Sequence, residues 1–286
     1  MPNIRIAADS TCDLSDELIE RYQITIIPLN IVLDDKSYLD GVEITPDEIY
    51  TWSDKYKKTP KTSAITPETA IEKIKGFVDN GDDIIFFGIS SEMSTTCNVM
   101  KLVGEELSTK RLFVIDSKNL STGIGLQVLR AAQMVTEGKK AEDIVKEIEA
   151  AREQVSASFV VDTLTYLARG GRCTQVTALL ANTLHLKPRI EVHNGEMGVG
   201  KKYRGNIEKV IHHYVKDLTE ELLQADSTRV FITHSGCSDE VIQKVYEEVK
   251  QLNYFKEILI TRAGGVISSH CGPNTLGVLY YKQIMK

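Results

Sequence analysis

Short apolar segments alternate with longer amphipathic ones along the first half of the chain. Runs of about four to eight apolar residues between polar ones are typical of buried strands, and they occur at residues 4–10, 82–91 and 111–117. Amphipathic segments, some preceded by a Ser or Asp cap, predict helices at residues 15–23, 93–107, 121–138 and 141–154. This alternation predicts a parallel sheet covered by helices.

The second half of the chain has a different pattern. Residues 156–163 predict a strand, and residues 186–205 a hairpin that turns at Asn194-Gly195, a dipeptide suited to tight hairpin turns. Helices are expected at residues 207–224 and 238–252, and a strand between them at residues 229–235. A further apolar stretch lies at residues 257–267. A length of 286 residues suits two domains. We therefore expect an α/β protein with two α/β domains: 1–155 with a parallel sheet between helices, and 156–286 with a mixed sheet.

Small hydroxyl side chains follow several predicted strands. They occur in the segments ADST (8–11), GISSEMSTT (88–96), VIDSKNLST (114–122) and THSGCSD (233–239). Ser, Thr and Asp at such places serve most often as helix caps. Ligands of open α/β sheets also bind at this edge, where helix N-termini favour anions. The pattern therefore indicates where a ligand site would lie without identifying the ligand.

Composition narrows the class of protein. A net charge of −6 gives no electrostatic reason to expect binding to nucleic acid or to an anionic membrane. No apolar run approaches the roughly 18 residues that span a bilayer, and the first residues lack the features of a secretory signal. The five cysteines (Cys12, Cys97, Cys173, Cys237 and Cys271) form no CxxC pair. They predict reduced thiols in the cytoplasm, with no disulfide framework and no zinc site.

Three familiar catalytic patterns are incomplete. The segment GEMGVGKK (195–202) resembles a nucleotide-binding loop, but Lys202 stands where Ser or Thr must reach magnesium, and the segment lies inside the predicted hairpin. Serines, Asp116 and His270 could supply a hydrolase triad, yet no GxSxG elbow is present. The other histidines lack metal-ligand spacing: His185, His193, His212, His213 and His234. We expect no metal and no cofactor.

Two segments contain more polar residues than their predicted local structure needs. Thr66-Pro67-Glu68 caps the helix that follows, so Thr62 and Ser63 just before it are not needed for capping. Arg169-Gly170-Gly171-Arg172 interrupts a helix before another opens at Thr174, which a simple helix–turn–helix with solvated arginines also explains.

The segment VISSHCGPNTLG (266–277) places His270 among serines and turn-forming residues. We predict a loop, fixed by the turn at Gly272-Pro273. From this segment alone, a core histidine that bonds to a backbone carbonyl is favoured over a histidine that faces a binding site.

Taken in order, these motifs resemble the DegV family, bacterial fatty-acid-binding proteins that include the FakB subunits of fatty acid kinase. The resemblance runs through nearly the whole chain. Its segments are DSTCDL (9–14), IPLNIVLDDKSYLDGVEI (27–44), KTSAITPE (61–68), ISSEMSTTCN (89–98), VIDSKNLSTGIG (114–125), YLARGGR (166–172), LHLKPRIEV (184–192), NGEM (194–197) and SSHCGPNTLG (268–277).

The resemblance implies a fatty acid whose tail lies in an enclosed apolar pocket, expected in the C-terminal domain (156–286), and whose carboxylate lies where the two domains meet. The residues that match the family's carboxylate contacts are Thr62, Ser94 with Thr95 beside it, and His270. Ser63 and Arg172 are expected next to the site. The chain departs from the family in reading TSAIT for the usual TSQPS and MSTT for the usual LSGT, so that Thr95 replaces a glycine and adds a side chain beside the carboxylate.

Elementary energetics agree with a lipid ligand. Burying about 14 methylenes at about 0.8 kcal/mol each gives about 11 kcal/mol before ordering costs, so the tail dominates affinity. Uncharged Thr, Ser and His donors can orient a carboxylate and leave it free to attack ATP. An arginine that forms two hydrogen bonds to the carboxylate would occupy the oxygen lone pairs needed for that attack.

The resemblance further implies a partner: a separate kinase subunit that carries ATP and phosphorylates the bound acid, of about C14–C18, to acyl phosphate. This chain would then be a non-catalytic, substrate-presenting protein, with Lys202 and Arg204, which follow Lys201, facing the kinase. The alternative for this basic run is a solvated strand end. Two alternatives stay open: a lipid carrier or sensor without a kinase, and a phosphoryl-transfer domain for a small polar substrate.

Overall fold

The structure is a computed structural model that describes residues 2–176 and 186–283. Its first sheet is parallel, with the order β2-β1-β6-β7. The strands are β1 (Ile4–Asp9), β2 (Thr25–Ile27), β6 (Asp83–Gly88) and β7 (Leu112–Asp116). Three of them, β1, β6 and β7, confirm the strands predicted from the apolar runs.

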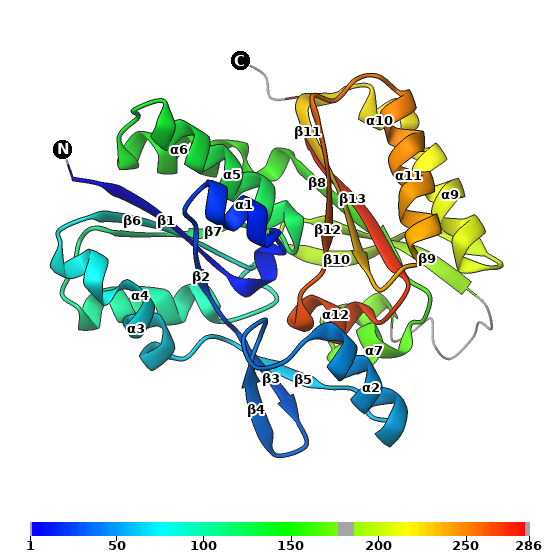
Figure 1. The fold of residues 1–286 in the computed structure, drawn as a ribbon, viewed down its shortest axis with the longest axis horizontal. Helices are drawn as coiled ribbons and strands as arrows, with labels where there is room; N and C mark the ends of the chain where they lie inside the picture. The colour runs from blue at the N-terminus through cyan, green and yellow to red at the C-terminus, as the bar shows by residue number, and fades with distance from the viewer. Residues whose placement is uncertain (1, 177–185, 284–286) are drawn as a thin grey trace.

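Helices cover both faces of the parallel sheet (Figure 1). On one face lie α3 (Pro67–Asp79) and α4 (Thr96–Glu106), and on the other lie α1 (Asp16–Arg21), α5 (Thr122–Thr136) and α6 (Ala141–Ala151), the last followed by the short 3-10 helix η2 (Arg152–Gln154). Successive side chains of β6 point to opposite faces of the sheet: Phe86 packs toward α3 and α4, and Phe87 packs toward α5. The helix predicted for residues 93–107 begins three residues later, at Thr96.

The predicted helix caps are present. Ser15 accepts a hydrogen bond from Leu18 N at the start of α1, and Thr66 accepts one from Thr69 N at the start of α3. Pro67 occupies the first turn of α3, where its missing N–H costs nothing.

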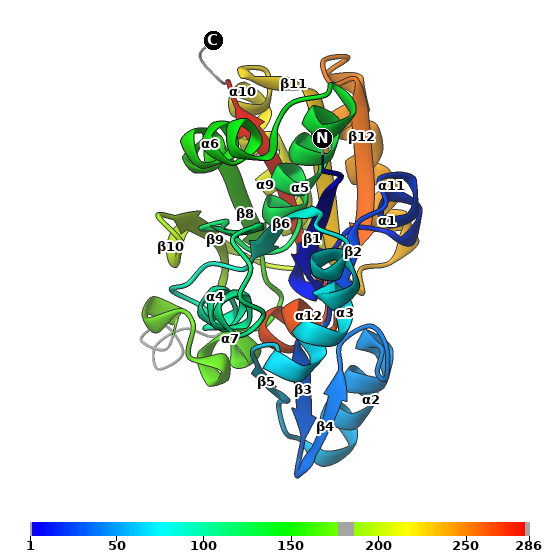
Figure 2. The ribbon, with the colours of Figure 1, turned by 90° about the vertical axis from the view of Figure 1, so that its left-hand side faces the viewer.

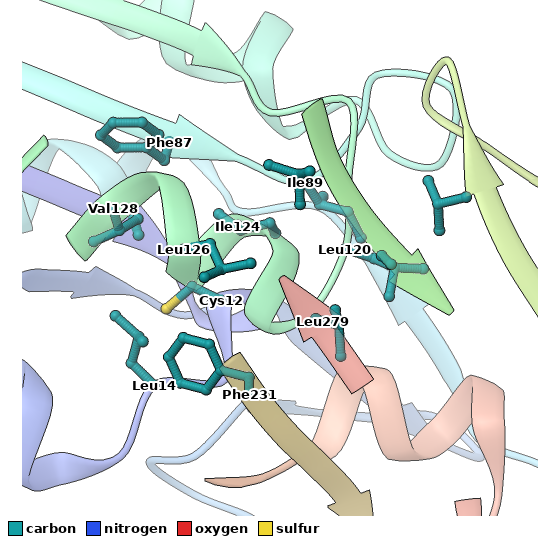
Figure 3. Packing of buried hydrophobic residues seen from close by; sticks show 14 of the residues in the cluster. Cys12, Leu14, Phe87, Ile89, Leu120, Ile124, Leu126, Val128, Phe231 and Leu279 are labelled. Atoms are coloured by element: carbon teal, nitrogen blue, oxygen red, sulfur yellow. The ribbon is translucent and has the colours of Figure 1, made fainter. Parts of the chain in front are cut away.

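Helix α5 is buried between two sheets. It contacts β1 and β6 of the parallel sheet and β8 and β13 of the second sheet. Figure 3 shows Phe87 on one side of this helix and Phe231 and Leu279 on the other. A single apolar core therefore connects the two halves of the protein.

The second sheet is mixed and has six strands in the order β10-β9-β8-β13-β11-β12, of which only β11 and β12 pair in parallel. The strands are β8 (Val155–Val160), β9 (Leu186–His193), β10 (Glu196–Arg204), β11 (Ala225–Ser235), β12 (Glu257–Arg262) and β13 (Thr275–Lys282). The predicted hairpin turn is confirmed, since Asn194 and Gly195 both have positive φ, 52° and 88°. β8 begins at Val155, and the domain boundary near residue 155 stays a prediction.

Three helices cover the outer face of this sheet: α9 (Ile207–Asp217), α10 (Thr219–Leu222) and α11 (Asp239–Gln251). The single helix expected over residues 207–224 is therefore two helices, which meet at Leu218. Leu218 is fully buried in the core beneath them, so side-chain packing coincides with the break.

A third, small antiparallel sheet was not predicted. Its strands β3 (Asn30–Leu33), β4 (Lys36–Leu39) and β5 (Lys61–Ser63) have the order β4-β3-β5, and helix α2 (Pro46–Tyr56) lies in the chain between β4 and β5. This sheet extends below the parallel sheet in Figures 1 and 2, next to α12 (Gly265–Cys271). It matters for the site because Thr62 lies on β5.

The loop predicted around His270 is wrong: residues 265–271 form the helix α12. Its serines are tolerated because Ser269 Oγ donates to Gly265 O, one turn back along the helix. Gly272, with φ of 74°, ends the helix, as the turn-forming sequence suggested. The apolar stretch 257–267 contains β12, which ends at Arg262, and the first residues of α12.

The residues that precede Gly171 are helical. α7 (Thr165–Gly170) ends at Gly171 in the left-handed conformation, as the sequence predicted. A new helical turn starts at residue 174, but most of the helix expected there, and His185, lie outside the described residues. The 3-10 helix η1 (Ser10–Cys12) follows β1.

Candidate functional site

The candidate site is an apolar pocket at the carboxyl edge of the parallel sheet. Counted together with the open space at its mouth, it contains about 520 Å³ of empty space. Ile89, just after β6, and Leu120, in the loop between β7 and α5, contribute to its wall. Two of the four strand exits, 88–96 and 114–122, therefore lead to this pocket.

Helix α12 and strand β5 bring together two of the expected carboxylate contacts. Thr62 Oγ1 and His270 Nε2 lie 2.8 Å apart, although 208 positions separate these residues in the sequence. Both side chains line the pocket. His270 Nδ1 is shielded from solvent and has no hydrogen-bond partner among the described residues. A proton on Nε2, facing Thr62 and the pocket, therefore leaves no donor unsatisfied.

His270 is held in its neutral form. Burial, and secondarily the positive charge of Arg172, lower the pKa of His270 to about 4. A neutral imidazole can donate one hydrogen bond through Nε2–H. The site thus offers a neutral donor to an anionic head group.

Ser94 also lines the pocket, one residue before the cap of α4. Its hydroxyl lies 2.9 Å from Thr96 Oγ1 and accepts from Thr96 N, so it helps to start this helix. A carboxylate beside Ser94 would lie near the N-terminus of an 11-residue helix, which favours negative charge. Thr95 is exposed and does not line the pocket, so its side chain, in this structure, is not beside the expected carboxylate position.

The two residues expected next to the site, Ser63 and Arg172, both line the pocket. Arg172 is oriented by backbone carbonyls: its Nη1 donates to Gly170 O at 2.7 Å and its Nε to Met93 O at 3.5 Å. The guanidinium is therefore engaged with the protein and does not form a fork toward Thr62.

The rest of the pocket wall is apolar and was not identified from the sequence. It comes from elements of both halves of the chain: Leu29, Met93, Leu167, Met197, Val266 and Ile267. A second, mostly apolar pocket of about 330 Å³ adjoins the first and shares Leu120, Ile267 and Cys271 with it. It continues toward Phe159 and Leu279 of the second sheet. Together the two pockets offer an apolar path that leads away from His270.

Lys202 and Arg204 lie outside the pocket, on β10. Both are exposed, and neither forms an ion pair with a described residue, whereas Lys201 pairs with Asp217 at 2.7 Å. Met197, on the same strand, lines the pocket, and five residues of strand correspond to about 16 Å. The basic pair is therefore near the pocket but not in it.

Two glycines, Gly170 and Gly265, at which α12 or its neighbours approach closely, were also not identified from the sequence. A Cβ on Gly170 would lie 2.3 Å from His270 Nδ1, and one on Gly265 would lie 2.7 Å from Asp40 Oδ1. The glycine pairs in ARGGR and AGGV were the available signal, because glycine often marks a close approach between segments.

Within residues 2–176 and 186–283, no cluster of His, Cys, Asp and Glu has the arrangement of a metal site. All five cysteines are free thiols. Among the described helices, none has the length and apolar character needed to cross a membrane.

Sequence comparison identifies the family. The family model described as "Uncharacterised protein, DegV family" matches residues 3–283. The chain belongs to the DegV family. A DegV domain-containing protein of Clostridium perfringens is 34% identical over 284 residues, covering 99% of this chain and 100% of the relative.

Solved structures of DegV proteins share the fold. A DegV family protein from Thermus thermophilus, described as fatty acid binding, superposes with a TM-score of 0.90 at 30% identity, covering 98% of this chain and 100% of that one. DegV from Bacillus subtilis, described as a fatty acid binding protein, gives 0.86 at 26% identity, with coverage of 99% and 100%. A stearic-acid-binding protein from Eubacterium ventriosum gives 0.84 at 28% identity, with 98% of each chain covered. The two-domain α/β fold is thus that of the DegV family.

Proposed function

We propose that this DegV protein binds one long-chain fatty acid, with its carboxylate between Thr62, Ser94 and His270. The observation that carries the proposal is that these three polar side chains line one mostly apolar pocket, in which Thr62 and His270 lie 2.8 Å apart. The fatty-acid-binding descriptions of the Thermus, Bacillus and Eubacterium proteins support it. A small polar substrate, by contrast, would leave most of this pocket wall without a partner.

The acyl tail follows the apolar path in this proposal. From the carboxylate it passes Ile89 and the three residues shared by the two pockets, and it ends near Phe159 and Leu279. Each buried methylene contributes about 0.8 kcal/mol, so the tail supplies most of the affinity. The head group adds orientation, because its three contacts come from three different elements.

The presentation of the acid to a kinase subunit belongs to the same proposal. Hydroxyl and neutral imidazole donors offset the free-energy cost of desolvating a carboxylate. They also leave an oxygen lone pair available for attack on ATP. Arg172 supports this arrangement, since its Nε and Nη1 are directed to backbone carbonyls. The phosphoryl donor and its binding site would come from the partner. A carrier or sensor without a kinase uses the same pocket and differs only in lacking this partner.

The first prediction is that the purified protein carries one equivalent of long-chain fatty acid. Native mass spectrometry is expected to show a single adduct, and organic extraction with mass analysis is expected to identify an acid of about C14–C18, because the apolar path suits a tail of many methylenes. Delipidated protein should rebind palmitate or oleate one to one. Folded protein that yields no fatty acid and fails to bind either one contradicts the proposal, and an adduct that is a small polar compound favours the phosphoryl-transfer alternative.

The second prediction concerns the partner surface, Lys202 and Arg204. Replacing both by glutamate is expected to reduce kinase-dependent acyl phosphate formation at least about tenfold, because the reversed charges repel a partner that recognises basic residues. Palmitate affinity should not change, since both side chains lie outside the pocket.

The matched control reverses two exposed lysines, Lys244 and Lys256, near the opposite edge of the second sheet. It makes the same change in net charge and is expected to keep the wild-type rate with a fatty acid kinase and ATP. Equal rates for the wild type and the Lys202/Arg204 variant would show that the kinase binds elsewhere.

A further inference from the structure

Helix α12 carries His270 near its C-terminal end, and its N-terminal end contacts the other half of the chain. The helix follows β12 of the second sheet and packs against α7 of the same half, but it also packs against η1, α2, β3 and β5 of the N-terminal half. Gly265 and His270 are five residues apart, which corresponds to about 7.5 Å along the helix. A helix this short moves as one body, so whatever fixes its start also fixes the imidazole.

Two buried carboxyl groups fix that start. Gly264 N donates to Asp13 Oδ1 and Gly265 N donates to Asp40 Oδ1, each at 2.8 Å. Asp13 follows η1, and Asp40 follows β4, so both come from the N-terminal half of the chain. Each hydrogen bond links residues more than two hundred positions apart.

The second oxygen of each carboxyl group is also engaged. Ser121 Oγ donates to Asp13 Oδ2, and Ser10 Oγ donates to Asp40 Oδ2 at 2.8 Å. With both oxygens bonded, neither carboxyl group can rotate without losing a hydrogen bond. The two acceptors that face α12 are therefore held in fixed positions.

The fit between the carboxyl groups and the helix is close. A Cβ on Gly265 would lie 2.7 Å from Asp40 Oδ1 and 2.5 Å from Ile31 Cδ1, and one on Gly264 would lie 3.2 Å from Asp13 Oδ1. The two glycines thus permit an approach that a larger residue at 265 would prevent.

This arrangement costs stability. Burial raises the pKa of Asp13 well above its ordinary value and raises that of Asp40 as well. A raised folded-state pKa means that ionisation is less favourable in the folded protein than in water. These groups therefore reduce the free energy of unfolding as the pH rises through their folded-state pKa values. Two buried carboxyl groups that cost stability at one helix end point to a positional role.

We propose that Asp13 and Asp40 are positioning residues for the head-group site: they hold the start of α12 so that His270, near its other end, faces Thr62. The inference rests on the proposed function, in which His270 contacts the fatty-acid carboxylate. The placement of His270 can be measured without any ligand, since its contact with Thr62 is within the protein.

The test is nitrogen NMR of the ligand-free protein with ¹⁵N-labelled histidine. His270 is assigned by the loss of its signals in His270→Ala. In Asp13→Ala and Asp40→Ala, the His270 ring nitrogen signals are expected to move toward the average of the two tautomers, because the Thr62 contact is weakened. Palmitate affinity is expected to fall about tenfold, as for loss of one hydrogen bond to a charged group.

Conservative variants separate positioning from general destabilisation. Asp13→Asn and Asp40→Asn keep an oxygen acceptor for the glycine amides and are expected to retain the wild-type His270 signals. The matched control is Asp82→Ala, which removes another buried carboxylate, paired with Arg5 at the opposite end of the parallel sheet, and is expected to leave the signals unchanged. Should an aspartate-to-alanine variant not fold, Ser10→Ala and Ser121→Ala loosen the same carboxyl groups and are expected to produce a smaller shift in the same direction.

Unchanged His270 signals in folded Asp13→Ala and Asp40→Ala, or in both serine variants where those do not fold, would overturn the proposal. So would an equal shift in Asp82→Ala. If the wild type shows a fixed His270 that depends on Asp13 and Asp40 but binds no palmitate, the positioning holds and the proposed function fails.

Discussion

His270→Ala is expected to slow kinase-dependent acyl phosphate formation by about a hundredfold while the fatty acid remains bound. The variant removes a donor to the carboxylate, and a hydrogen bond to a charged group contributes about 1.5–3 kcal/mol, or about tenfold to a hundredfold. Misorientation of the attacking oxygen adds to this loss, because small errors in the placement of reacting groups slow a reaction strongly. The tail keeps the lipid in the pocket, since its methylenes supply most of the affinity.

The measurement pairs single-turnover acyl phosphate formation with native mass spectrometry of the same sample. His213→Ala, at an exposed position on α9, is the matched control and should behave as the wild type. A folded His270→Ala variant that is phosphorylated at the wild-type rate would assign His270 to a purely structural role. Loss of the lipid together with activity would instead show that the head group dominates binding.

Much of the fold could be predicted because its main sheets follow simple periodicities. Fully buried strands such as β6 read as apolar runs, and Asn194-Gly195 identified the hairpin. The small third sheet was missed because β4 and β5 are only four and three residues long and partly exposed, so they show no apolar run. β4 pairs with β3 in a short hairpin, whereas β5 pairs with β3 from a distant segment, with Asn30 opposite Ser63.

The site was predictable only in part, and for a related reason. The sequence singled out His270 and Thr62, but their 2.8 Å contact exists because α12 packs beside β5, which no local pattern describes. The helix itself was missed because serines weaken a helical pattern, whereas here Ser269 bonds back to the helix backbone. No role of its own was assigned to Asp13 from the sequence, since its bond to Gly264 is visible only in the folded chain.

Ile267→Phe is expected to lower the affinity for stearate by about two hundredfold and to leave decanoate binding nearly unchanged. Ile267 is buried and lies where the two apolar pockets meet, so a larger ring closes the passage between them. Excluding about four methylenes at about 0.8 kcal/mol each removes about 3 kcal/mol, which corresponds to about two hundredfold. A short tail that ends before Ile267 keeps all of its contacts.

The comparison is made by titrating delipidated protein with both acids. Ile267→Val, which makes the same position smaller, is the control and is expected to bind stearate within a few-fold of the wild type. Thermal unfolding accompanies both variants, because overpacking a core costs about 1–3 kcal/mol and must not be mistaken for a binding effect. An equal loss of stearate and decanoate would mean that the passage does not follow the acyl tail, and unchanged stearate binding would place the tail in another part of the pocket. The chain-length dependence therefore tests the path itself, since a general loss of stability weakens both acids alike.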